Sequence, residues 1–196
     1  MPPVIHTSLS LLERLRTQPD EAAWRRLDDL YRPLIRHWLR RDPTLRDEAE
    51  DLVQEVLTVL VRELPHFQRE RAGSFRCWLR TITWNRLQAF WQARRQRPQL
   101  LGDDSDGSIL AQLEDPQSAL SRQWDEEHDR HVVRRLLERI EPQFEPATLQ
   151  AFRRTVFDGA KAAEVAEELG ISVNAVLLAK SRVLKRLRQE AEGLIG

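Results

Sequence analysis

The stretch that decides the fold is residues 47–98, which read DEAEDLVQEVLTVLVREL (47–64), PHFQRERAGS (65–74) and FRCWLRTITWNRLQAFWQARRQRP (75–98). Residues 47–63 carry six acids and one arginine, a net charge of −5. Residues 69–97 carry eight arginines and one glutamate, a net charge of +7. Arginine neutralises phosphate and aromatic rings stack on bases, so the basic segment favours nucleic acid. An acidic helix would repel DNA, so we expect it to face a different, basic partner.

The whole chain is neutral, because its 196 residues include 31 Lys+Arg and 31 Asp+Glu. That length allows one or two small domains, and the scarcity of glycine and of β-branched runs favours helices. Cys77 is the only cysteine, which excludes an internal disulfide and argues against a cysteine zinc site. We find no signal peptide and no apolar run that approaches a membrane span, so we expect a cytoplasmic protein without membrane insertion.

Apolar residues recur at helical spacing through most of the chain, which predicts an all-α fold of two small helical domains. We expect a first domain over residues 1–97, an acidic flexible linker over 98–118 and a second domain over 119–196. Thr44 or Asp47 is expected to cap the third helix, and Pro33 to kink or break the second. The predicted helices are 8–16, 21–40, a third ending at Pro65, 74–97, 120–140, 146–157, 161–169 and 173–192.

Charge alternates in blocks along the second half. Residues 103–129 hold nine acids against Arg122 alone, and residues 180–188 hold five bases and no acid. Such blocks are usually solvated faces. Here the two basic blocks fall on predicted helices and the acidic one largely on the linker, which favours a functional role.

On a helical wheel, the predicted fourth helix has two distinct sides. Phe75, Leu79 and Ile82 fall on one side, with Trp78, Ala89 and Ala93, and form a predicted core face. The opposite side carries Trp84, Gln88, Trp91 and Arg95, with Arg80 nearby. This second side is either a stripe that contacts bases and phosphates, or a surface on which Trp84 and Trp91 pack against the first long helix.

The C-terminal segment fits a helix-turn-helix. Ala166, Gly170 and Val176 have the required spacing: a small residue where the helices touch, a glycine for a left-handed turn and an apolar residue that enters the core. In the second of these helices we expect Val173, Val176, Leu177, Leu184 and Leu187 to face inward. Leu178 and the polar and basic residues of that helix are expected to face a DNA major groove.

These two modules, in this order, resemble the extracytoplasmic-function (ECF) sigma factors of bacterial RNA polymerase. The marks are DEAEDLVQEV (47–56), FRCWLRTITWN (75–85) and EVAEELGIS..AV..AKSRVLKRLR (164–188). The resemblance implies a non-enzymatic transcription initiation factor without cofactor or metal. Its partners would be core RNA polymerase, through the β′ clamp helices and the β flap, promoter DNA, and in some cases an anti-sigma factor.

The resemblance also implies a role for each module. The acidic helix would dock on the clamp helices through Asp51, Leu52, Gln54 and Glu55. The loop and basic helix would open and read the −10 element with Phe67, Arg69, Arg71, Ser74, Arg80, Trp84, Asn85, Gln88, Trp91 and Arg95. The acidic linker would thread toward the RNA exit channel. The helix-turn-helix would read the −35 element with Ser172, Asn174, Leu178, Ser181, Arg182, Lys185, Arg186 and Arg188.

One departure concerns the recognition helix. Many relatives carry Arg or Ser early in that helix, where this chain has Leu177, Leu178 and Ala179. This composition suggests contacts to phosphates and methyl groups more than readout by hydrogen bonds.

Two other readings explain less of the chain. A stand-alone dimeric helix-turn-helix regulator accounts for the C-terminal half but leaves residues 47–91 without a role. An enzyme would need a site, and His128 and His131 are the only histidines close together. Their spacing could bind a metal on a helix, but no second pair of ligands completes a site. Cys77 has no neighbouring base that would activate it as a nucleophile.

Overall fold

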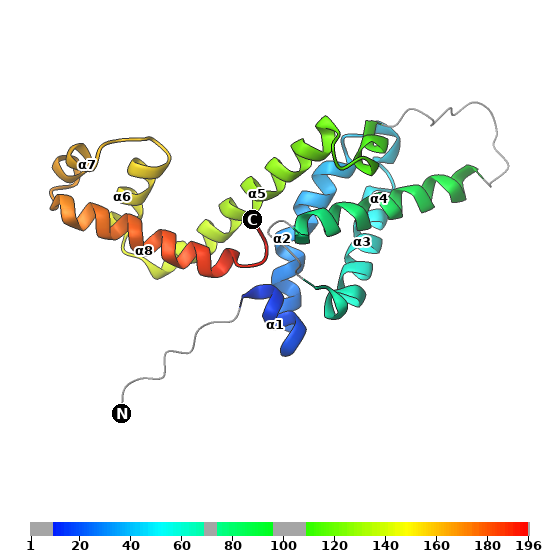
Figure 1. The fold of residues 1–196 in the computed structure, drawn as a ribbon, viewed down its shortest axis with the longest axis horizontal. Coiled ribbons are helices and arrows are strands. Elements are labelled where there is room, and N and C mark those ends of the chain that lie inside the picture. The colour runs from blue at the N-terminus through cyan, green and yellow to red at the C-terminus, as the bar shows by residue number, and fades with distance from the viewer. Residues whose placement is uncertain (1–9, 69–73, 96–108, 196) are drawn as a thin grey trace. The chain divides into compact units, whose positions relative to one another are not determined.

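The computed structural model describes residues 10–68, 74–95 and 109–195. These residues form helices and no strand, which confirms the all-α fold. The chain divides into two compact units, one made mainly of residues 11–132 and the other mainly of residues 133–192 (Figure 1).

The described residues of the first unit form four α-helices, three short 3-10 helices and the beginning of a fifth α-helix. In chain order the elements are α1 (Leu11–Thr17), α2 (Glu21–Leu39), η1 (Pro43–Leu45), α3 (Ala49–Glu63), η2 (Leu64–His66), α4 (Ser74–Arg95), η4 (Ile109–Glu114) and α5 (Ala119–Ile140).

Helix α2 is the central element of this unit, and it begins at a side-chain cap. The Asp20 carboxylate accepts a hydrogen bond from the Ala23 amide at 2.7 Å, which satisfies a donor that the first helical turn leaves open. Pro33 lies inside α2, but the helix continues past it to Leu39, so the predicted break is absent.

Helix α3 begins differently from the expectation. Its N-cap is Glu48, whose side chain makes no capping bond, so neither Thr44 nor Asp47 caps it. The Thr44 amide instead donates to the Asp42 carboxylate at 2.9 Å, and Asp42 thereby caps the N-terminus of η1. Burial of Ala49, Leu52 and Val53 fixes the first turns of α3 in place of a cap.

The core of the first unit lies between α2, α3 and α4. Tyr31 and Ile35 from α2 are fully buried with Val53 and Val56 from α3 and Leu79 from α4. Trp38 of α2 packs against Trp124 of α5, with ring centroids 5.0 Å apart. The beginning of α5 therefore contributes to this core, although it follows α4 by more than twenty residues.

Part of the expected linker is ordered in this unit. Residues 109–114 form η4, which packs against α4 and buries Leu110 and Leu113. The Ser118 hydroxyl accepts from the Ser121 amide at 3.0 Å and begins α5. Residues 98–108 of the expected linker lie outside the described residues. The boundary between the two units falls inside α5, between residues 132 and 133, whereas the second domain was expected to begin at residue 119.

The second unit comprises the end of α5 and the elements η5 (Glu141–Gln143), α6 (Pro146–Val156), α7 (Ala162–Leu169) and α8 (Val173–Ala191). The bounds of α5 to α8 agree with the expected helices to within one residue. A small core of Ala151, Val165, Ala166, Val176 and Ala179 joins α6, α7 and α8.

Candidate functional site

An acidic and polar face of α3 is open to solvent. Asp51, Gln54 and Glu55 are exposed, as expected for contacts to a partner. Leu52 differs from the expectation, because its side chain is 1% exposed and belongs to the core. The candidate docking face therefore consists of Asp51, Gln54 and Glu55. Thr58 and Val61, both exposed, continue it along the helix.

Several acids of this segment are already paired with arginines. Glu50 accepts from Arg36 at 2.8 Å and lies 3.7 Å from Arg40, and Glu48 lies 3.6 Å from Arg94. Gln54 accepts from Arg32 at 3.0 Å. The ion pairs seen in the described part of the chain do not involve Asp51 or Glu55, so these two carboxylates carry the charge that the face presents.

The side of the basic helix α4 that carries Arg80, Trp84 and Trp91 is buried, so the two tryptophans pack within the unit and do not form an exposed stripe. Arg80, Trp84 and Trp91 are only 5%, 8% and 9% exposed. The two indole rings contact each other in an edge-to-face arrangement, with centroids 5.8 Å apart. The physical reason is that α3 covers one side of α4, while η4 and α5 contact others. Conversely, Ala89 and Ala93, expected in the core, are exposed.

Acids of α5 hold two of the α4 arginines. Arg80 donates to the Asp125 carboxylate at 2.8 Å, and Arg76 donates to Asp129 at 2.7 Å. Arg76 also lies 3.4 Å from Asp125. Part of the acidic block seen in the sequence therefore neutralises the basic helix within the same unit.

Phe67, which the resemblance assigned to the −10 element, belongs to an aromatic cluster. Its ring stacks on Trp78 at 4.7 Å and meets the edge of Phe75 at 5.6 Å. Phe67 is buried, so in this structure it packs against α4 rather than facing solvent. The expectation that Phe67 contacts DNA came from the family resemblance alone, and the residues themselves carried no signal of its exposure.

Four of the other residues assigned to the −10 element are at least partly accessible to solvent. Asn85 and Arg95 are exposed, and Ser74 and Gln88 are half-buried. Arg69 and Arg71 lie outside the described residues. The accessible side of α4 is therefore polar, and its aromatic rings are structural.

A tight turn joins α7 to α8. Gly170 adopts a left-handed conformation with φ of 64°, and the Ile171 amide donates to the Ala166 carbonyl at 3.0 Å. The Ser172 hydroxyl accepts from the Ala175 amide at 3.1 Å and caps α8. Ala166 and Val176 are buried in the small core. Each of these residues takes the backbone or packing position that its type suggested.

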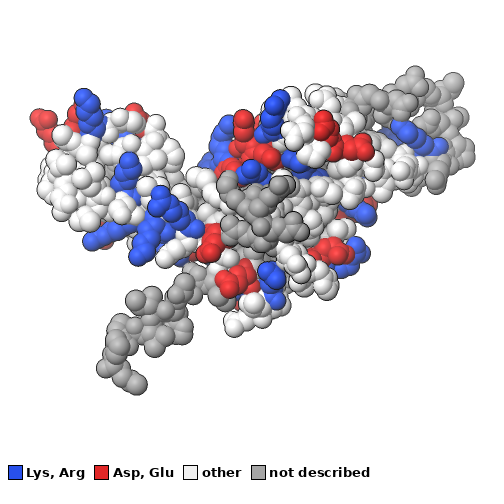
Figure 2. Space-filling view, in the orientation of Figure 1, with Lys and Arg blue, Asp and Glu red and all other residues white. Residues whose placement is uncertain are grey.

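The exposed face of α8 is apolar in its first turns and basic further along. Asn174, Leu178, Ser181, Arg182, Lys185 and Arg188 are exposed, as expected, and so is Ser172. Figure 2 shows Lys and Arg side chains gathered along this helix. Arg186 is half-buried, because it donates to Gln143 at 2.8 Å and pairs with Glu190. Val173 and Leu177 were expected inward but are exposed, because the packed positions are Val176, Ala179 and Val183.

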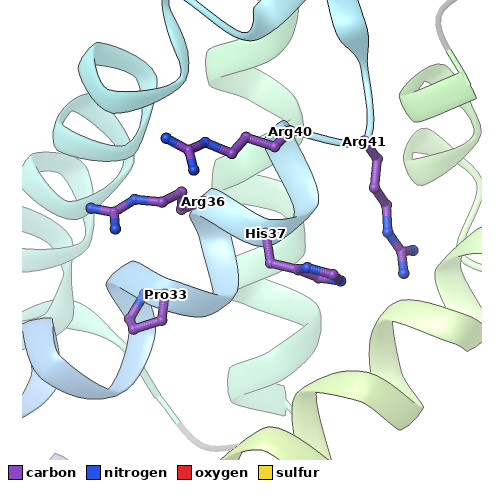
Figure 3. Close-up of a pocket in the computed structure, with 5 residues that line it drawn as sticks. All are labelled: Pro33, Arg36, His37, Arg40 and Arg41. Atoms are coloured by element: carbon purple, nitrogen blue, oxygen red, sulfur yellow. The ribbon is translucent and has the colours of Figure 1, made fainter.

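The structure has a hollow of about 400 Å³ lined by cationic side chains near the C-terminal end of α2, which the sequence did not predict. The residues that line it are Pro33, Arg36, His37, Arg40 and Arg41 (Figure 3). Two carboxylates pair with these arginines. Glu50 forms ion pairs with Arg36 and Arg40, and Glu127 accepts a hydrogen bond from Arg41 at 2.7 Å. His37 lies 3.6 Å from Glu127. These pairs tie α2 to α3 and α5. Only the i, i+4 spacing of Arg36 and Arg40 signalled this cluster in the sequence.

The two neighbouring histidines face different surroundings. The His131 ring lies 2.7 Å from the Leu30 carbonyl oxygen. His128 is fully buried, lies 3.0 Å from Asp129 and stacks on the ring of Tyr31. Burial raises the pKa of the Tyr31 phenol well above its ordinary value, and the charge of Asp129 adds to this shift. Within the described residues, no three His, Cys, Asp or Glu side chains gather as a metal site would require.

Comparison with known protein families gives a match within the first unit. Residues 27–97 match the family model described as Sigma-70 region 2. The matched residues include the candidate docking face on α3 and the whole of α4. The match supports a relation to sigma-70 family sigma factors, whose members bind RNA polymerase and recognise promoters. No curated protein matches the chain. None of the described helices combines the length and apolar character needed to cross a lipid bilayer.

Proposed function

We propose that this chain is an ECF-type transcription initiation factor that binds core RNA polymerase and directs it to promoters with specific −10 and −35 elements. It works by binding and by stabilising melted DNA, without covalent chemistry. The observation that carries the proposal is the exposed acidic face of α3, within the residues that match Sigma-70 region 2.

The partner of that face would be the β′ clamp helices of the polymerase. Asp51 and Glu55 present carboxylates outside the internal ion pairs described above, and Gln54 lies between them on the same side of α3. Two carboxylates and an amide on a rigid helix suit a basic helical surface, because opposite charges steer the encounter and fix its register.

The −10 surface is proposed on the accessible side of α4 and the loop before it. Asn85, Gln88 and Arg95, with Ser74, would contact the DNA together with Arg69 and Arg71. The buried residues Phe67, Arg80, Trp84 and Trp91 would act indirectly, since they hold α4 against η4, α5 and the aromatic cluster. The amides of Asn85 and Gln88 can hydrogen-bond to an unpaired base, and the arginines can neutralise phosphates.

The −35 surface is proposed on α8, with the unit that carries it lying near the β flap. Ser172 at the helix N-terminus and Arg188 would contact phosphates, and Asn174, Leu178, Ser181, Arg182 and Lys185 would line the groove. Arg186 is left out of this set, because Gln143 and Glu190 hold its guanidinium. The exposed bases of α8 and the absence of acids from residues 180–188 support this surface.

The proposal is tested by transcription from a library of DNA fragments with randomised promoter sequence. Bacterial core RNA polymerase with the purified chain should enrich fragments that share two short elements, whereas polymerase alone and the chain alone should enrich none. Enrichment of a single palindromic site by the chain alone would instead identify a dimeric regulator and contradict the proposal.

A paired substitution on α8 makes a narrower prediction. Arg182→Ala with Lys185→Ala should weaken binding of the polymerase complex to the enriched promoter and lower the slope of log affinity against log salt by up to about two, since two cations are lost from the groove between the phosphate backbones. Polymerase binding by the variant should be unchanged. An unchanged promoter affinity and salt slope would remove α8 from the DNA interface.

A further inference from the structure

Three large apolar side chains stand exposed on the first turns of α8. Val173 is 44% exposed, Leu177 53% and Leu178 45%. They lie at positions i, i+4 and i+5, so Val173 and Leu177 share one side of the helix and Leu178 flanks it. Solvent-exposed apolar groups that cluster on one surface of a small unit indicate a contact surface.

The core of the second unit does not use these side chains. The packed positions of α8 are Val176, Ala179, Val183 and Leu187, all buried. Ser172 caps the helix and Gly170 sets the turn before it, so the first turns of α8 are fixed by other residues. The three exposed side chains are therefore available to a partner without disturbing the fold.

The charge of the same helix indicates what that partner is. Arg182, Lys185 and Arg188 follow the apolar turns and are exposed, and residues 180–188 contain no acid. A polyanion complements this half of the helix. The major groove of duplex DNA offers phosphates at its edge and, on its floor, one apolar group, the C5-methyl of thymine.

We propose that Val173, Leu177 and Leu178 read thymine C5-methyl groups in the major groove of the upstream promoter element. This inference rests on the proposed function of α8. Asn174, exposed next to Val173, adds an amide of the kind that pairs with adenine. We therefore expect thymines at the contacted positions of this element to set its sequence preference. Guanines read by arginine would contribute less.

The test compares thymine with uracil, which differs only by that methyl group. The upstream element of the promoter enriched from the randomised library is synthesised with each thymine replaced in turn by deoxyuridine. The complex of core polymerase with the full chain should bind about fourfold more weakly for each contacted methyl lost, from the transfer free energy of one buried carbon group. Equal affinity for every thymine and uracil duplex would overturn the inference.

Two variants make the assignment specific. Leu177→Ala with Leu178→Ala should lower affinity for the thymine duplex and abolish most of the penalty for uracil, since no side chain remains to contact the methyl. Arg182→Ala, the matched control, should weaken both duplexes equally and keep the penalty. A penalty of the same size in the double leucine variant would overturn the inference. Loss of polymerase binding by that variant would also overturn it, because the leucines would then contact polymerase rather than DNA.

Failure of the proposed function gives a different result. If the chain does not bind polymerase, or no upstream element is enriched, both the function and the inference are wrong. If an element is enriched but uracil substitution has no effect, only the methyl readout is wrong. The side chains concerned are exposed, so circular dichroism should show unchanged helicity in every variant.

Discussion

Tyr31 is the only tyrosine of the chain, and its hydroxyl is buried without a hydrogen-bond partner among the described residues. A buried, unpaired hydroxyl costs free energy, so Tyr31→Phe should leave the free energy of unfolding unchanged or raise it by up to about 1 kcal/mol. Urea unfolding measures this value. A loss of more than about 1 kcal/mol would show that the hydroxyl has a partner.

The same residue makes the stability depend on alkaline pH. The phenol has a raised pKa in the folded state, so above about pH 10, the ordinary value, the unfolded chain releases this proton and the folded chain retains it. Stability should therefore fall as the pH rises past that point, and the Tyr31 contribution to the fall should be absent in Tyr31→Phe. Tyrosinate absorbance should appear only on unfolding.

Arg80 and Asp125 form the least exposed ion pair between α4 and α5, with the Arg80 side chain 6% exposed. Asp125→Asn should destabilise the protein by about 2 kcal/mol, because it leaves a buried guanidinium without its counter-charge. Arg80→Met in the Asp125→Asn background should recover much of that loss. A double-mutant cycle by urea unfolding measures the coupling, and additive effects of the two substitutions would mean that the pair is not formed.

At the scale of elements, the turn between α7 and α8 depends on Gly170. Its φ of 64° strains any residue with a Cβ, although no atom lies within 4 Å of where that Cβ would be. Gly170→Ala should therefore lower the free energy of unfolding by about 1 kcal/mol, and Gly170→Asn by less, since asparagine tolerates this conformation better. Equal losses for alanine and asparagine would indicate a steric rather than a backbone cause.

The sequence predicted the helices well and the sides of α4 poorly. Helical spacing, prolines and the Gly170 turn are local signals, so the bounds of α5 to α8 agree to within one residue. Arg80 is buried against α5, and η4 packs against α4. Both elements follow later in the chain, and no local pattern places them against α4. A wheel also could not distinguish an aromatic stripe for bases from one that packs, because both require the same residues.

The same limit explains the first turns of α8. Val173 and Leu177 resembled core residues by type, but Val176, Ala179 and Val183 fill the contact with α6 and α7. The small size of Ala179 lets α8 approach its neighbours closely, and the larger side chains are then left outside. Residue type alone predicts burial less well than the geometry of packing does.

At the scale of the whole molecule, the net charge of zero conceals an internal pairing of opposite charges. Acids at residues 125–129 engage Arg41, Arg76 and Arg80, and Glu50 engages arginines of α2. These pairs leave Asp51 and Glu55 on one surface and the bases of α8 on another. Charge blocks in the sequence predicted that such surfaces exist, but the structure was needed to show which charges remain available.

The central claim is that the face formed by Asp51, Gln54 and Glu55 binds core RNA polymerase, and fluorescence anisotropy of the labelled chain with purified bacterial core enzyme tests it most directly. Asp51→Arg with Gln54→Ala should weaken binding at least about thirtyfold, through charge reversal and a lost polar contact, while helicity stays unchanged. The matched control, Glu126→Arg with Gln123→Ala on the exposed side of α5, makes the same change of charge and should bind like the wild type. Equal affinity of the α3 variant and the wild type for core polymerase would contradict the account.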